Sequence, residues 1–194
     1  MILKVDLSKA FDRVNWLYIR MLLTYLGFPF IFIKWIMSCI TNIPFSILVN
    51  GIASPFFSSE RGLRQGCLLS PLLFLLVMEG LSRLIKEEHR RGKLQGIKIS
   101  DGCMLTHLLF VDDVLIFLNG SIGDLTIIKA SFSLFQMTIG ILINDTKSML
   151  TEAKCTPHEI LFSLQCFPFT QLGLEEGLKY LGYKLKPPGY KIVD

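Results

Sequence analysis

The sequence predicts an α+β fold, an antiparallel sheet with helices packed on one face. Short apolar runs of strand length repeatedly end at turn residues, and longer segments with apolar residues at helical spacing lie between them. The chain has 194 residues, of which 51% are hydrophobic and 19% charged, so it can bury a substantial core. Hairpins interspersed with helices favour an α+β arrangement.

The first part of the chain predicts one strand and two helices. A strand is expected at residues 2–6, followed by a helix at about residues 16–26 that Gly27 can end. Pro29 can begin a second helix, which continues until residues 42–44 stop it.

The middle of the chain predicts a hairpin and then a long helix. Residues 45–52 read as a strand that enters a turn at Asn50-Gly51, with a return strand at about residues 56–60. Ser70 can cap, and Pro71 can open, a helix that runs to about Arg90. Its charged end, residues 86–93, is either a solvated helix end or a nucleic-acid contact.

The last part of the chain returns to strands. After the turn at residues 119–121 we expect a helix that Gly140 ends, and residues 178–185 are the last recognisable element. Residues 151–177 show no clear pattern. The other predicted strands span residues 97–99, 104–110, 114–118 and 141–143.

Composition narrows the functional classes. The mean hydropathy of +0.50 is high, which indicates either a membrane segment or a fragment lacking the surface that covers its apolar faces. Charges and helix breakers interrupt the apolar stretch at residues 17–40, and the run at residues 72–78 is too short to span a bilayer. We therefore expect no transmembrane segment, no secretory signal and an intracellular protein.

Five cysteines without a C-x-x-C motif, accompanied by three histidines, argue against a disulfide framework or a zinc site. The formal net charge of +4 is compatible with a polyanionic partner and does not identify one.

The pair Asp112-Asp113 is the strongest chemical signal, because strand-like apolar residues flank it on both sides. Two adjacent carboxylates repel each other, and Mg²⁺ or Mn²⁺ would neutralise them. A solvated turn is the plainer interpretation. Asp6 ends another apolar strand and can join the pair only if the two segments are neighbours in one sheet. Carboxylates that hold two metal ions serve phosphoryl transfer in polymerases and nucleases.

Five segments, in this order, resemble the reverse transcriptases of non-LTR (LINE-type) retrotransposons, particularly those of plants. The three specific motifs are KVDLSKAFDRVNW at residues 4–16, GLRQGCLLSP at residues 62–71 and FVDD at residues 110–113. GILINDTKS at residues 140–148 and YLGYKL at residues 180–185 are similar to two weaker ones. Leu68 and Val111 depart from the usual proline and alanine, and Val111, being β-branched, is expected to fit a strand.

The resemblance implies a right-hand polymerase palm that acts on an RNA template, a DNA primer and deoxynucleotides (dNTPs). In the family pattern Asp6 and Asp112 hold two Mg²⁺ ions and Asp113 completes the cluster. Lys147 matches a lysine proposed to protonate the leaving pyrophosphate, although an exposed lysine at a strand end is the common alternative. A retroelement polymerase would act in the nucleus.

Further site residues follow from the same resemblance. Phe11 corresponds to the bulky residue that excludes a ribose 2′-hydroxyl, with core packing as the alternative. Arg64, Gln65 and Gly66 correspond to the loop beside the incoming nucleotide, or simply form a turn before a capped helix. The family's primer grip, a hairpin that positions the primer backbone, corresponds to Tyr180, Leu181 and Gly182.

The whole chain, residues 1–194, is thus expected to be a fragment of a reverse transcriptase domain. It would contain the palm, part of the fingers at about residues 27–61 and the primer-grip region at about residues 178–185, without the N-terminal fingers, endonuclease and thumb. Three hypotheses follow: an RNA-directed DNA polymerase domain, a truncated non-catalytic remnant that keeps the palm fold, and another palm-type enzyme. Phe11 and the Gln65 loop argue against the third.

Overall fold

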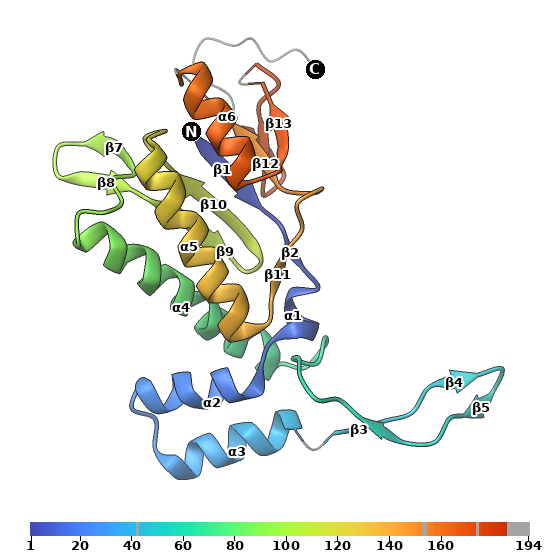
Figure 1. Cartoon of the computed structure of the whole chain (residues 1–194). Helices are drawn as coiled ribbons and strands as arrows, with labels where there is room; N and C mark the ends of the chain where they lie inside the picture. Colours follow the sequence, from blue (N-terminus) through green and yellow to red (C-terminus); the bar gives the residue numbers. More distant parts are fainter. Residues whose placement is uncertain (42, 153–154, 174, 186–194) are drawn as a thin grey trace. The chain divides into compact units, whose positions relative to one another are not determined.

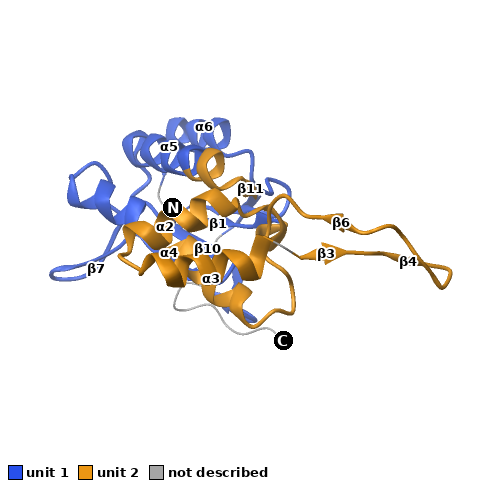
Figure 2. Ribbon diagram, turned by 90° about the horizontal axis from the view of Figure 1, so that it is seen from below, with its two compact units in different colours: residues 1–8, 81–134, 143–194 blue, residues 9–80, 135–142 orange. Residues whose placement is uncertain are grey.

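A computed structural model describes residues 1–41, 43–152, 155–173 and 175–185 (Figure 1). The chain divides into two compact units (Figure 2). The first unit comprises residues 1–8, 81–134 and 143–194, and the second unit comprises residues 9–80 and 135–142.

A five-stranded sheet in the order β13-β12-β1-β10-β9 forms the centre of the first unit. β1 pairs antiparallel with both β10 and β12, and β9 pairs antiparallel with β10, while β12 and β13 run parallel. The expected antiparallel sheet is therefore present with one parallel pair at its edge. The strands are β1 (Ile2–Val5), β9 (His107–Phe110), β10 (Asp113–Phe117), β12 (Met149–Thr151) and β13 (Thr170–Leu172).

The parallel pair arises from a helix that the sequence analysis did not assign. α6 (Pro157–Cys166) connects β12 to β13, and a helical crossover returns the chain to the same end of the sheet, as parallel pairing requires. Its start is a capping box, in which Thr156 and Glu159 bond to each other's backbone N–H. The Thr-Pro-His-Glu string is the signal that could have predicted this helix.

Helices lie on one face of the sheet, as expected. α5 (Ile122–Ile139) and α6 lie over the same face in Figure 1. The core beneath them includes the fully buried side chains of Leu3, Val5, Val114 and Ile116, which the register of β1 and β10 places on one face.

The first unit also holds several short strands. β7 and β8 pair antiparallel, as do β14 and β15. The predicted strand at residues 104–110 is therefore two strands, one paired with β7 and the other with β10. Thr106 lies between them, and its carbonyl accepts the N–H of Phe117. The short strands are β2 (Leu7–Ser8), β7 (Ile97–Ser100), β8 (Cys103–Leu105), β14 (Leu178–Tyr180) and β15 (Tyr183–Leu185).

The second unit contains α1 (Ala10–Arg13), α2 (Trp16–Tyr25), α3 (Phe30–Thr41) and the beginning of α4 (Leu69–Arg90). The predicted helix limits are confirmed for α2 and for the start of α3. Gly27 ends α2 with a φ of +80°. Of the residues expected to stop α3, Asn42 lies outside the described residues.

A long hairpin also belongs to the second unit (Figure 2). Asn50 and Gly51 both have positive φ, so the predicted turn is confirmed. The two long strands expected on either side were wrong in extent. The ladder is interrupted where the Ser46 hydroxyl donates to the Ser54 carbonyl and the Ile47 N–H donates to the Ser54 hydroxyl. The strands are β3 (Pro44–Phe45), β4 (Leu48–Val49), β5 (Ile52–Ala53) and β6 (Phe57–Ser58), and β11 (Leu142–Ile143) follows α5.

Two further observations complete the fold. The expectation that Ser70 caps α4 was wrong: the helix begins at Leu69, and the Ser70 N–H already donates to the carbonyl of Cys67 at 3.2 Å. Within the described ranges, none of the helices combines the length and apolar character that crossing a bilayer requires.

Candidate active site

Two of the three predicted carboxylates stand at the end of paired strands in the first unit. β1 and β10 are antiparallel, and the last paired residues are Val5 and Val114. Asp6 directly follows Val5 and Asp113 directly precedes Val114, so both aspartates stand at the same end of this strand pair. The fold thus joins segments that are 107 residues apart in the sequence.

The backbone of Asp6 is held on both sides. Its N–H donates to the buried Ser148 Oγ at 3.0 Å, and its carbonyl accepts the N–H of Asn144 at 2.9 Å. Asn144 and Ser148 bracket a tight turn in which Lys147 is exposed. The turn that carries the predicted proton donor is therefore bonded directly to the strand end that carries Asp6.

The hairpin between β9 and β10 has a two-residue turn, Val111-Asp112, so Asp112 lies at the tip and Asp113 is the first residue of β10. Val111 has a φ of +55°, and the expectation that it fits a strand was wrong. Two-residue hairpin turns require positive φ at their first position. A β-branched residue is strained there, and such strain is frequent at functional sites.

A second hairpin approaches the carboxylate face of the sheet. The predicted hairpin of β14 and β15 is confirmed, with Leu181 and Gly182 both at positive φ in its turn. Lys4 Nζ donates to the Lys179 carbonyl at 2.9 Å and lies 3.9 Å from Asp113 Oδ1.

The carboxylate of Asp113 also affects the pKa of Tyr180, the next residue in this hairpin. Partial burial raises the pKa of its hydroxyl, and the negative charge of Asp113 raises that pKa further. Tyr180, one of the residues predicted to grip a primer, therefore lies near Asp113.

The donor set partly fits a divalent metal ion. Carboxylate oxygens are the ligands that Mg²⁺ and Mn²⁺ prefer, and Asp6 and Asp113 stand at the same end of the β1–β10 pair. Across residues 1–41, 43–152, 155–173 and 175–185, however, no three His, Cys, Asp or Glu side chains are grouped closely enough to hold a metal ion. The structure pairs two of the predicted ligands without gathering all three.

The remaining predicted residues belong to the second unit. The half-buried ring of Phe11 stacks on the buried ring of Phe74, with 4.5 Å between centroids and 17° between planes. Phe11 therefore has the packing role that was its alternative interpretation, and its ring is still partly exposed.

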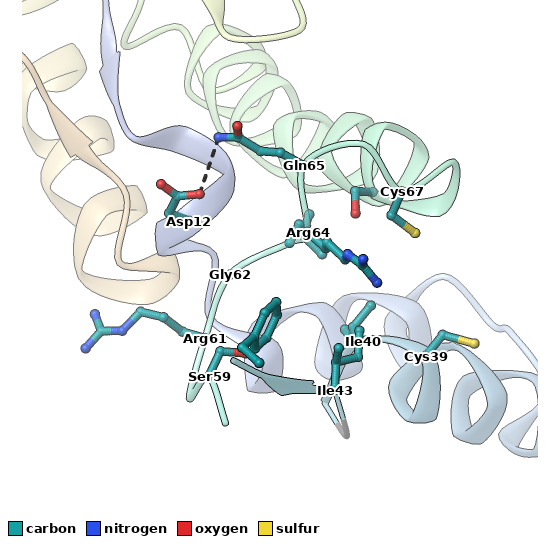
Figure 3. A pocket seen from close by; sticks show the side chains of 13 residues that line it. Asp12, Cys39, Ile40, Ile43, Ser59, Arg61, Gly62, Arg64, Gln65 and Cys67 are labelled. Atoms are coloured by element: carbon teal, nitrogen blue, oxygen red, sulfur yellow. Dashed lines mark hydrogen bonds between the residues drawn. The ribbon is translucent and has the colours of Figure 1, made fainter. Parts of the chain in front are cut away.

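The loop at residues 62–66 is bonded to the segment that follows Phe11. Leu63 N–H donates to the Phe11 carbonyl at 2.7 Å, and Trp16 Nε1 donates to the Gly62 carbonyl at 2.6 Å. Gln65 Nε2 donates to Asp12 Oδ1 at 3.4 Å (Figure 3). Gly62 has a φ of +93°, and a Cβ there would meet the Asp12 carbonyl oxygen at 2.6 Å. The loop is thus held in one position by close backbone contact.

Arg64 and Gln65 line a cavity of about 560 Å³ in the second unit (Figure 3). Arg61 and Cys67 also line it, and the sequence analysis did not select either of them. The pKa of the Cys67 thiol is lowered, mainly by backbone N–H groups of Leu69 and Ser70 at the start of α4 and also by the charge of Arg64. Arg61 directly precedes the predicted motif at residues 62–71. The two arginines that flank Gly62-Leu63, Arg61 and Arg64, were therefore the available signal.

Gly66 has a φ of +81° and open space where a side chain would be. Its backbone is therefore accessible to a ligand. The neighbouring cavity is lined by two arginines, Arg61 and Arg64, and by the carboxylate of Asp12.

Comparison with known proteins adds family information. The model of the family described as reverse transcriptase (RNA-dependent DNA polymerase) matches residues 1–185. An uncharacterized mitochondrial protein of Arabidopsis thaliana is 43% identical over 67 residues, which cover 34% of this chain and 55% of that protein.

Two retrotransposon polyproteins match almost the entire chain. The Pol polyprotein of the type-2 retrotransposable element R2DM of Drosophila melanogaster is 27% identical across 97% of the chain. The corresponding polyprotein of the type-1 element R2 of Popillia japonica is 28% identical across 97% of the chain. The chain spans only 18% and 31% of the length of these two relatives.

Proposed function

Because the chain belongs to the reverse transcriptase (RNA-dependent DNA polymerase) family, we propose that it is the palm-containing part of an RNA-directed DNA polymerase of a LINE-type retroelement. The reaction is transfer of a deoxynucleotide to the 3′-hydroxyl of a primer. The observation that supports the proposal is the β1–β10 register, which ends at Val5 and Val114, the chain neighbours of Asp6 and Asp113. Carboxylates on adjoining strands are a common device for phosphoryl transfer.

Asp6, Asp112 and Asp113 are the proposed ligands of two Mg²⁺ ions, or of Mn²⁺. When bound, such ions supply positive charge where negative charge develops on phosphorus. Asp112 stands at the tip of a strained two-residue turn, so a change in that turn moves its carboxylate relative to β10. The bonds of Asp6 to Ser148 and Asn144 keep the other strand end in place.

Two further groups in the first unit have proposed roles. Lys147 is exposed in the turn bonded to Asp6 and donates a proton to the leaving pyrophosphate. Tyr180, Leu181 and Gly182, in the hairpin beside Asp113, position the backbone of the DNA primer.

In the second unit, the partly exposed ring of Phe11 excludes the 2′-hydroxyl of a ribonucleotide. Arg64 and Gln65 bind the dNTP or the RNA template from the wall of the cavity, with the open backbone of Gly66 allowing close approach. Residues 27–61 are then the retained part of the fingers, and residues 178–185 the primer-grip region.

A second candidate function is that of a truncated, non-catalytic remnant. It is favoured by the absence of a three-ligand group among the side chains that the structure describes. The short share of the relatives' length that this chain spans is compatible with either candidate.

Primer extension on an RNA template separates the two candidates. We expect the purified chain to incorporate deoxynucleotides when Mg²⁺ is present, and Asp112→Ala to abolish incorporation. Asp101→Ala is the matched control, since Asp101 is an exposed aspartate in another hairpin turn of the same unit. A folded chain that incorporates nothing with either metal ion supports the remnant.

A further inference from the structure

We propose that Lys4 is a positioning residue that holds the hairpin of β14 and β15 beside Asp113, and competes there with a divalent cation. The inference rests on the proposed function for the roles of the hairpin and of the carboxylates Asp6 and Asp113. Its contacts lie entirely within the first unit.

The register of β1 places Lys4 for this role. Lys4 is two residues before Asp6 and therefore points to the same face of the sheet. It stands opposite Leu115, which makes Asp113 its diagonal neighbour on β10. A single ammonium group thus reaches both Asp113 Oδ1, at 3.9 Å, and the Lys179 carbonyl, at 2.9 Å.

The position of Lys4 is unusual for a lysine. It lies in the middle of β1, which has a strand on either side, and its neighbours Leu3 and Val5 are completely buried. Its own side chain is only 20% exposed. The bond to Lys179 is nevertheless exposed, so the ammonium group reaches Asp113 and the hairpin while it stays in contact with water.

Most of the hairpin is exposed. Of the residues in β14 and β15, only Leu178 is buried, and Tyr180 is half-buried. An isolated two-stranded hairpin is marginally stable in water. The bond from Lys4 to the Lys179 carbonyl therefore adds to the attachment that Leu178 provides.

The charge of Lys4 has a second consequence. An ammonium group beside Asp113 neutralises part of the repulsion between Asp113 and Asp6, and it repels a divalent cation that approaches the same oxygens. Cation binding and hairpin attachment are therefore linked through one side chain, and each weakens the other.

Hydrogen exchange and Mn²⁺ binding test the proposal in the full 194-residue chain. In the presence of EDTA, we expect Lys4→Met to accelerate amide exchange at residues 178–185 about tenfold. We also expect this variant to lower the dissociation constant for Mn²⁺, measured by electron paramagnetic resonance, roughly three- to tenfold. Lys4→Arg keeps the charge and donors and should remain within about twofold of the wild type in both measurements.

Lys179→Met is the matched control. It removes a positive charge from the same hairpin and leaves the carbonyl that Lys4 binds, so both measurements should stay within about twofold of the wild type. Unchanged exchange in Lys4→Met, or equal changes in Lys179→Met, would overturn the proposal.

If Lys4→Met does not fold, the wild type is compared with Asp113→Asn instead. Hairpin exchange in the wild type should then rise with salt, which screens the ion pair, and Asp113→Asn should remove that dependence. Salt dependence that is identical in both proteins contradicts the proposal. Exchange requires no nucleotide incorporation, so a chain without polymerase activity can still confirm the role of Lys4.

Discussion

Phe11 stacks on Phe74 with 4.5 Å between their ring centroids, while part of the Phe11 ring remains exposed. Packing and selection of the sugar are therefore compatible roles for one side chain. Replacement of either ring distinguishes the two roles.

We expect Phe11→Ala to lower the free energy of unfolding by about 1 to 3 kcal/mol, because a half-buried ring contact is lost. If primer extension is observed, the same variant should accept ribonucleotides that the wild type rejects. Phe74→Ala is the control, since it removes the partner ring and should cost more stability without admitting ribonucleotides. Equal ribonucleotide acceptance in both variants would mean that Phe11 acts only through packing.

Asp6→Asn tests the two carboxylates at the same end of the β1–β10 pair. Like charges on neighbouring strands are unfavourable, so this variant should be more stable than the wild type by about 0.2 to 1 kcal/mol in EDTA. Urea unfolding in EDTA and in Mg²⁺ measures the difference. Mg²⁺ should stabilise the wild type and leave Asp6→Asn unchanged. Asp101→Asn, remote from this pair in the sheet register, should behave as the wild type does.

Gly62→Ala tests the close approach that holds the loop at residues 62–66. The substitution combines an unfavourable positive φ with a contact of 2.6 Å to the Asp12 carbonyl oxygen. We expect a loss of about 2 to 4 kcal/mol in the free energy of unfolding. Gly51→Ala has a similar φ and open space around its Cβ, so it should lose only about 1 to 2 kcal/mol. Thermal unfolding of the two variants separates steric contact from backbone strain.

Glu87 predicts a pH dependence at the end of α4. Hydrogen bonds from Arg90, followed by those from Arg91, lower the pKa of the Glu87 carboxyl from 4.5 to about 2. Because the folded pKa is depressed, the contribution of this group to stability is present above pH 4.5 and is lost as the pH falls toward 2. Carboxyl chemical shifts followed by NMR measure the midpoint. Arg90→Gln should raise it, and an unshifted midpoint in the wild type would contradict the contacts seen here.

Local rules account for most of the elements. Helical spacing and Gly27 predicted α2, and Asn50-Gly51 predicted a turn whose residues have the required positive φ. Residues 178–185 form the expected hairpin. Each of these signals acts over a few residues, through side-chain periodicity or a backbone conformation that glycine and asparagine readily adopt.

Elements that depend on distant partners were predicted less well. Val111 has the composition of a strand residue and is held in a turn, because pairing of Phe110 with Asp113 leaves only two residues to reverse the chain. The extent of β3 to β6 was also overestimated, since bonds made by the hydroxyl groups of Ser46 and Ser54 replace part of the ladder. The α6 helix is different, because the capping box of Thr156 and Glu159 is a local signal from which the start of this helix could have been predicted.

The sequence by itself determined the α+β class, most element limits and the carboxylates Asp6, Asp112 and Asp113 as the chemical centre of interest. Only the tertiary structure decided that Asp6 and Asp113 stand at the same end of the β1–β10 pair, that Lys4 lies between Asp113 and a second hairpin, and that Asp112 joins no three-ligand group among the residues that the structure describes. The reason is physical: local patterns specify backbone conformation, whereas strand register and side-chain contacts arise from pairing between segments far apart in the chain.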